Sequence, residues 1–127
     1  MILGIGVDIV EIDRIKNSME RYEDRFLSRI FNKQEIDYCM QKGNPAIHFA
    51  ARFASKEAVV KSLGTGFSGG IKWTDIEIVN SPESGQPSVK LHAQADEVLK
   101  KIGGSVIHLS ITHSAHYAVA QAVCEKI

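Results

Sequence analysis

The 127-residue sequence has little of several features that mark specialised classes of protein. Its only cysteines, Cys39 and Cys124, lie far apart and form no metal-binding or redox motif, which leaves a disulfide or two free thiols. We expect free, partly buried thiols. There is no excess of charge, because 15 basic residues balance 15 acidic ones. Neither nucleic acid nor a membrane surface is therefore an expected partner, and electrostatic recognition has to come from local patches.

The sequence also has no hydrophobic run long enough to span a bilayer. Residues 1–8 carry no basic region and end on the charged Asp8, which is not the pattern of a signal peptide. We therefore expect a cytoplasmic protein. The remaining composition is ordinary for a globular protein, with 44% hydrophobic and 24% charged residues, and this length predicts one domain over residues 1–127.

Hydrophobic periodicity predicts an α+β fold. Residues 3–9 alternate between apolar side chains and Gly4, Gly6 and Asp8, which is typical of a half-buried strand. The two glycines share a face with Asp8 and leave room for something bulky beside its carboxylate. The further predicted elements are a helix from 12 that includes Arg25, helices at 32–41 and 46–63, strands at 73–79 and 88–92, a helix at 93–102, and strands at 106–112 and 117–124. The closing hairpins favour a compact domain with a largely antiparallel sheet and one long central helix.

Two acids are candidates for a metal site. Asp8 lies late on the first strand, and Glu57 lies on the central helix, one turn before Lys61 and on the same face. One carboxylate from a strand and one from a helix, with waters in the remaining positions, suit a hard ion such as magnesium. The structural alternatives are a turn or capping role for Asp8 and a surface ion pair between Glu57 and Lys61. The spacing does not decide between a metal site and these structural roles, because the two acids are 49 positions apart in the sequence.

The loop at 64–70 and His113 are candidates for contact with a phosphate. The loop matches G-x-G-x-x-G, but it follows a predicted helix instead of opening one, which excludes a dinucleotide-binding fold. Its backbone N–H groups are candidate donors to a phosphate beside Lys61, and a plain helix-ending loop is the alternative. His113 lies where the last hairpin turns and is either a phosphate donor or a solvated turn residue.

Three arginines share one face of the first predicted helix: Arg14, Arg21 and Arg25. Charged rows on helices are usually solvated surface. Three arginines without acids among them also suit an acidic helix of a partner protein.

Two segments resemble the signatures of a known family. Residues 4–15, GIGVDIVEIDRI, are similar to the opening signature of the bacterial holo-acyl-carrier-protein synthases, and residues 53–61, FASKEAVVK, with LGTG at 63–66, are similar to the second. The similarity continues through 73–78, 85–87 and 109–113, and so covers essentially the whole chain. Two signatures at this separation are far more specific than any other motif in the sequence.

The resemblance implies an enzyme that transfers the 4'-phosphopantetheine arm of coenzyme A to a serine of apo acyl carrier protein in fatty acid biosynthesis. It implies a homotrimer of α+β subunits with active sites where neighbouring subunits meet. Carried over by position, Asp8 and Glu57 become magnesium ligands, Lys61 completes the catalytic set, and Glu57 or a metal-bound water is the base. The implied coenzyme A contacts are Arg52, Lys61, Gly64, Thr65, Gly66 and His113, and the implied docking residues for the carrier are Arg14, Arg21 and Arg25. Val10 stands where larger relatives have a second acid, so a water is expected in place of that ligand.

Two alternatives remain open from the residues. One is a non-catalytic trimeric module that binds an adenine nucleotide, in which the carboxylates pair with Lys61 and Lys56. The other is a metal-dependent pyrophosphatase acting on coenzyme A.

Overall fold

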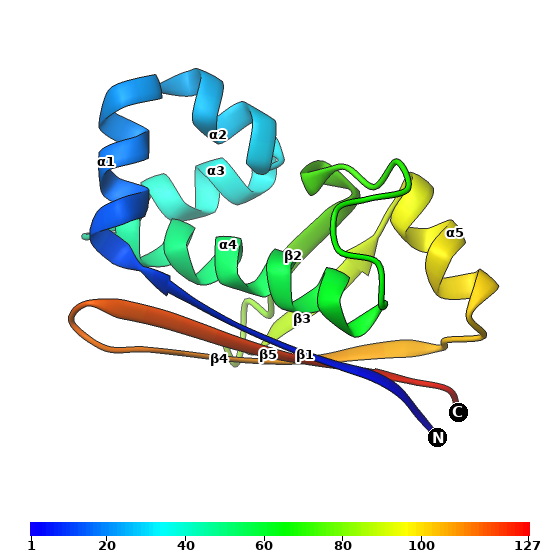
Figure 1. Ribbon diagram of the computed structural model, residues 1–127. Helices are drawn as coiled ribbons and strands as arrows, with labels where there is room; N and C mark the ends of the chain where they lie inside the picture. The colour runs from blue at the N-terminus through cyan, green and yellow to red at the C-terminus, as the bar shows by residue number, and fades with distance from the viewer.

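The computed structural model describes residues 1–127, which form five strands, five α-helices and one short 3-10 helix (Figure 1). In chain order these are β1 (Ile2–Glu11), α1 (Ile12–Tyr22), α2 (Asp24–Ile30), α3 (Lys33–Met40), α4 (Pro45–Ser62), η1 (Trp73–Asp75), β2 (Ile76–Asn80), β3 (Pro87–Leu91), α5 (Ala93–Lys101), β4 (Val106–His113) and β5 (Tyr117–Glu125).

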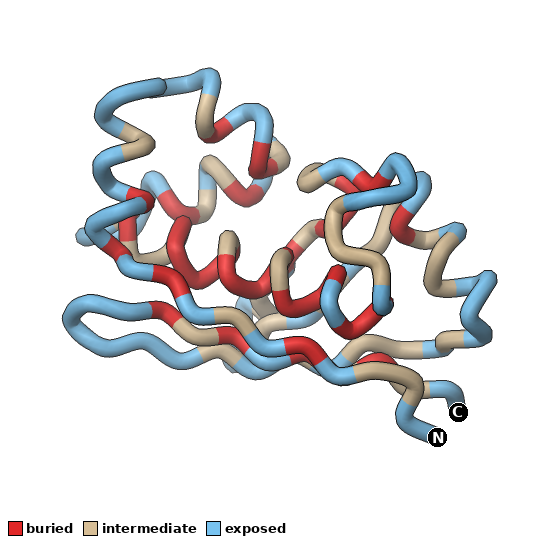
Figure 2. The backbone as a smooth tube through the Cα atoms, viewed as in Figure 1, coloured by how far each residue is buried: buried red, intermediate tan, exposed pale blue.

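The elements form helices over an antiparallel sheet. Strands β1, β5 and β4 pair in that order, and β2 pairs with β3 in a separate two-stranded sheet. Helix α4 lies along the upper face of the three-stranded sheet, with α1, α2 and α3 above one end and α5 at the other (Figure 1). Buried residues follow α4 and the strand segments beneath it (Figure 2). The predicted α+β fold with one long central helix is confirmed.

Small residues bring α4 close to the sheet. A Cβ atom on Gly4 would lie 2.0 Å from the carbonyl oxygen of Ser62, and one on Gly6 would lie 1.9 Å from that of Ala58. The room that the glycines were expected to leave for a bulky group beside Asp8 is filled by the α4 backbone. Strand β5 adds three fully buried alanines to this inner face, opposite Val10, Asp8 and Gly6: Ala118, Ala120 and Ala122.

The other face of β1 is apolar and exposed. Ile5, Val7 and Ile9 are 61%, 56% and 62% exposed. Alternation over 3–9 predicted a strand correctly, but the side that the subunit buries is the glycine side. A face of large apolar side chains open to solvent is typical of an interaction surface.

The first predicted helix is in fact two helices. Helix α1 ends at Tyr22, Glu23 has a φ of 51°, and α2 begins at Asp24. Arg25 therefore lies on α2, so the prediction that it shares one helix face with Arg14 and Arg21 is wrong. No glycine or proline marks this break in the sequence. The predicted strand at 73–79 also begins later, at Ile76, because Trp73–Asp75 form a 3-10 turn.

Candidate active site

Asp8 and Lys61 meet where β1 passes beneath α4. The Nζ atom of Lys61 lies 3.2 Å from Oδ1 of Asp8 and donates to the carbonyl oxygen of Val7 at 3.0 Å. The lysine side chain is 48% exposed and that of Asp8 is 18% exposed, so the pair borders solvent. The close approach of α4 to Gly4 and Gly6 makes this contact possible, since both elements present backbone to each other.

Glu57 lies within charge-interaction range of both groups. Burial raises the pKa of Glu57 above its ordinary value, the negative charge of Asp8 raises it further, and the ammonium of Lys61 opposes the rise. Two acids that are remote in sequence thus share one small region with a single lysine. Their roles in catalysis stay predictions.

This arrangement fits a divalent cation. Two ionised carboxylates and one ammonium leave one negative charge uncompensated. Nowhere in the chain do three or more His, Cys, Asp or Glu side chains gather as metal ligands. Magnesium commonly uses only one or two carboxylates and takes its other ligands from water and substrate phosphates. Val10 extends the inner face beyond Asp8, is 8% exposed and offers no ligand.

The glycine loop closes the end of α4. The N–H groups of Gly64, Thr65 and Gly66 donate to the carbonyl oxygens of Lys61 and Val60 at 3.0, 3.3 and 3.4 Å. Gly64 and Gly66 have φ values of 83° and 60°, a backbone conformation that favours glycine. These N–H groups are therefore not free to hold a phosphate, and a contact with coenzyme A would have to use other atoms of the loop.

His113 lies toward the opposite end of α4 from the loop. It ends β4, and its charge helps to lower the pKa of His48, after burial and Lys42 and Arg52. His48 precedes Lys61 by 13 residues, which is about 20 Å along a helix axis. Within one subunit, His113 and the glycine loop are thus far apart.

Arg52 and Lys56 belong to a buried cluster on another side of α4. Arg52 is 4% exposed, its Nη2 donates to Oδ1 of Asn80 at 2.6 Å, and its guanidinium lies 4.2 Å from the ring centroid of Tyr38. Lys56 pairs with Glu35 at 2.7 Å. The alternative in which Lys56 neutralises the carboxylates at the β1–α4 crossing is therefore wrong. The Glu35–Lys56 pair was missed by the sequence analysis, although a lysine within the apolar stretch of α4 is a signal for it.

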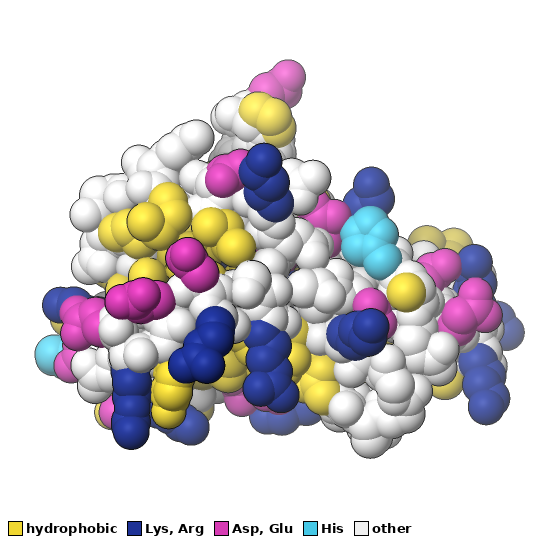
Figure 3. Space-filling model, turned by 90° about the horizontal axis from the view of Figure 1, so that it is seen from above, with side chains coloured by type: hydrophobic (Ala, Val, Ile, Leu, Met, Phe, Trp, Pro, Cys, Tyr) yellow, Lys and Arg dark blue, Asp and Glu magenta, His cyan; other side chains and the backbone are white.

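The exposed arginines lie on the helices above α4. Arg14 and Arg21 are exposed on α1, and Arg25 is exposed at the start of α2. Arg25 lines a cavity of about 420 Å³ with Tyr22, Phe26 and Arg29. Seen from the helix side, hydrophobic side chains gather at the left, on the side where α1 and α2 lie (Figure 3). Acidic side chains lie beside the hydrophobic ones in the same view, so this part of the surface combines apolar side chains with charges of both signs (Figure 3).

Comparisons with known proteins identify the family. The model of the 4'-phosphopantetheinyl transferase superfamily matches residues 4–122. The holo-[acyl-carrier-protein] synthase of Koribacter versatilis is 48% identical over 125 residues, which cover 98% of this chain and 99% of that protein. The chain belongs to the holo-[acyl-carrier-protein] synthase family. It is an enzyme of the phosphopantetheinyl transferase class.

Solved structures of the family share the fold. The synthase of Neisseria meningitidis has a TM-score of 0.90 and 34% identity, covering 99% of this chain and 100% of that one. The synthase of Helicobacter pylori, solved in complex with coenzyme A, has a TM-score of 0.83 and 33% identity, covering 95% and 99%. None of the helices in the present structure combines the length and apolar character needed to cross a membrane.

Proposed function

We propose that the chain transfers the 4'-phosphopantetheine moiety of coenzyme A to a serine of apo acyl carrier protein, with magnesium, in cytoplasmic fatty acid biosynthesis. The products are holo carrier protein and adenosine 3',5'-bisphosphate. The observation that carries the proposal is the contact between Lys61 and Asp8 at the β1–α4 crossing, within charge-interaction range of Glu57. Family membership and relatives solved with coenzyme A support this donor.

Lys61 is suited to bind the diphosphate of coenzyme A. Its ammonium has three N–H donors, and two of them are directed to Asp8 and to the carbonyl of Val7, which leaves one for a phosphate oxygen. Asp8 and Glu57 would hold magnesium, which when bound neutralises charge on the leaving nucleotide as the phosphorus–oxygen bond breaks. Positioning and charge stabilisation suffice for this reaction, so no covalent intermediate with the enzyme is needed.

Glu57 is the candidate base for the carrier serine. The serine oxygen forms the new bond to phosphorus, the bond to the nucleotide breaks, and the serine proton passes to Glu57 directly or through a water. In the absence of a metal ion, burial and the charge of Asp8 raise the pKa of Glu57, which makes it a stronger proton acceptor than an ordinary carboxylate.

We infer that the enzyme is a homotrimer whose active sites form between subunits. The exposed apolar side chains of β1 supply a surface for assembly: Ile5, Val7 and Ile9. His113 and the glycine loop lie toward opposite ends of α4, so both contact the nucleotide part of one coenzyme A only if a neighbouring subunit supplies one of them. The number of three subunits follows from the family resemblance.

We further propose that the carrier docks on the exposed arginines of α1 and α2. Changing Arg14 and Arg21 to glutamate should raise the KM for the carrier by more than about tenfold and leave coenzyme A binding unchanged. Docking by the parent enzyme should weaken with added salt, since salt screens exposed charges. An unchanged KM would refute this docking surface.

The deciding experiment incubates the protein with coenzyme A, magnesium and an apo carrier, and then weighs the carrier by mass spectrometry. We expect a carrier heavier by one phosphopantetheine arm and release of adenosine 3',5'-bisphosphate. Cleavage of coenzyme A without modification of the carrier would identify a pyrophosphatase instead. Binding of coenzyme A with no reaction would identify a non-catalytic nucleotide-binding module.

A further inference from the structure

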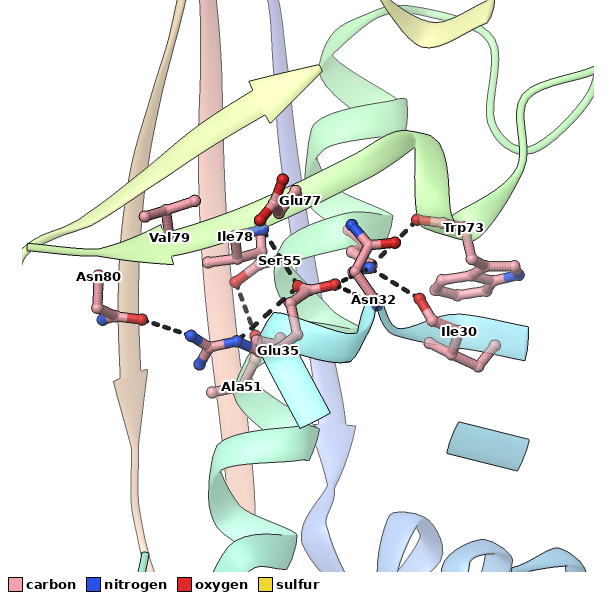
Figure 4. A network of polar contacts seen from close by, with 12 residues as sticks. Ile30, Asn32, Glu35, Ala51, Ser55, Trp73, Glu77, Ile78, Val79 and Asn80 are labelled. Carbon is pink, nitrogen blue, oxygen red and sulfur yellow. Dashed lines mark hydrogen bonds and ion pairs between the residues drawn. The ribbon is translucent and has the colours of Figure 1, made fainter. Parts of the chain in front are cut away.

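A buried ion pair on α4 takes no part in the chemistry described above. Lys56 is 0% exposed, and its Nζ lies 2.7 Å from Oε1 of Glu35, which is 1% exposed. The same ammonium donates to the carbonyl oxygens of Ile30 at 2.7 Å and Trp73 at 3.2 Å (Figure 4). Lys56 thus uses all three of its N–H donors, each on a different element.

Both carboxylate oxygens of Glu35 also accept hydrogen bonds. Its Oε1 also accepts from the N–H of Asn32 at 3.0 Å, and its Oε2 accepts from the N–H of Ile78 at 3.1 Å (Figure 4). The Nε atom of Arg52 lies 3.8 Å from Oε2. Through these contacts the pair ties α4 to the end of α2, the start of α3, η1 and β2.

Stability alone does not account for such a pair. Burying two charges is costly, and well-packed apolar residues of similar volume often stabilise a protein as well or better. A fully satisfied buried pair instead specifies one arrangement of the elements that it joins. The lysine of this buried pair, Lys56, is adjacent in sequence to Glu57 of the candidate active site.

Helix α4 is held on two nearly opposite sides. At about 100° per residue, Ala58 and Ser62 lie about 200° and 240° around the helix from Lys56. Their backbone atoms are the ones that approach Gly6 and Gly4 of β1. By the same rule, Glu57 lies between the two held sides, about 100° from Lys56. A rotation of α4 that moved Glu57 away from Asp8 would break one of these two sets of contacts.

We propose that Glu35 and Lys56 are positioning residues, which fix the rotation of α4 and so hold Glu57 beside Asp8. They contact neither substrate nor cofactor and act only through Glu57. The proposal rests on the proposed role of Glu57 in transfer.

The test uses the double variant Glu35→Gln/Lys56→Met, which removes both charges of the pair and leaves the buried Arg52 with its hydrogen bond to Oδ1 of Asn80. We expect kcat to fall by at least about tenfold, because small displacements of a reacting group cost this much or more. The magnesium concentration for half-maximal rate should rise, while the KM for the carrier stays within about twofold. Lys100→Met is the matched control, since its ion pair with Asp96 is exposed, and it should keep parental values.

A binding measurement supplies a readout that does not depend on turnover. Calorimetry should show that magnesium increases the affinity for coenzyme A less in the double variant than in the parent. In a Glu57→Gln background, adding the two changes should cause no further loss of this magnesium-dependent gain. A further loss there would show that the pair does not act through Glu57 and would overturn the proposal.

Two further comparisons keep the outcome decisive. If the double variant does not fold, Glu35→Asp replaces it in the test. This change keeps the charge and shortens the side chain by one methylene. Below its melting temperature, Glu35→Asp should show the same fall in kcat. A folded variant with parental kcat and magnesium requirement would make the pair purely structural. If Glu57→Gln itself keeps parental kcat, the proposed function of Glu57 fails; if only the pair variants keep it, the positioning proposal alone fails.

Discussion

The two faces of the paired strands β1 and β5 differ in the size of their side chains and in what covers them. The inner face presents glycine and alanine to α4, and its residues are mostly buried. The outer face presents Ile5, Val7 and Ile9, each more than half exposed. Within one subunit, the face of β1 and β5 that has the smaller side chains is therefore the better packed.

This difference in side-chain size explains how the candidate site is assembled. Small side chains on the inner face let the α4 backbone approach β1 closely, and that approach brings Lys61 within 3.2 Å of Asp8. Large side chains on the outer face contribute nothing to the subunit interior and are available for another subunit. One face thus positions the residues proposed for catalysis, and the other is the proposed assembly surface.

The largest expected effect comes from adding one methyl group to the inner face. In Gly6→Ala, the new Cβ would meet the backbone oxygen of Ala58 at 1.9 Å, so α4 would have to move. We expect the free energy of unfolding to fall by about 3 kcal/mol, measured by chemical denaturation, with loss of transfer activity. Gly43→Ala is the control, because no atom lies within 4 Å of its Cβ position. Equal stability of the two variants would contradict the account of this face.

Removing one charge from the inner face should abolish function without unfolding the protein. Asp8→Asn keeps the size of the side chain, so the melting temperature and assembly should change little. Transfer should fall by more than about a hundredfold, since even the loss of a residue that only orients a metal ligand can cost that much. Asp96→Asn, in an exposed ion pair, is the matched control for activity. Near-parental turnover by Asp8→Asn would remove Asp8 from the site.

A charge on the outer face should separate the subunits and leave each one folded. In Val7→Lys, the lysine replaces a side chain that is 56% exposed in the subunit, so its stability should change by less than about 0.5 kcal/mol. Burying that charge between subunits is costly, and we expect the dissociation constant of the assembly to rise by more than about a hundredfold. Light scattering measures the mass in solution. Val79→Lys, at a site 40% exposed on β2, should not change it.

The smallest expected effect concerns the pH dependence of stability. Because the folded protein raises the pKa of Glu57, it binds this proton more tightly than the unfolded chain does. Stability from this source is fully present below the ordinary pKa of 4.5 and is lost as the pH rises through the raised value. Metal-free Glu57→Gln should therefore unfold with a higher free energy than the parent at neutral pH and with a similar one below pH 4.5. An equal difference at both pH values would contradict this.

Long, strongly periodic segments were predictable from sequence, and irregular ones were not. The central helix and the last two strands lie within one or two residues of their predicted ranges, because their patterns extend over many residues. The break at Glu23 was missed, since neither glycine nor proline occurs there and the residue itself adopts a positive φ. The paired N–H groups of the glycine loop were also unpredictable, because they depend on how α4 ends.

The sequence by itself determined the helix and strand order apart from the break at Glu23, the family and the residue types available for chemistry, because local periodicity and signature motifs are read within short windows. Only the tertiary structure decided that Asp8 contacts Lys61 within charge-interaction range of Glu57, that Lys56 pairs with Glu35 instead, and that Arg52 is buried. It also decided which face of β1 is covered. Such contacts join residues far apart along the chain, and their distances depend on how closely backbones pack, which a one-dimensional pattern does not contain.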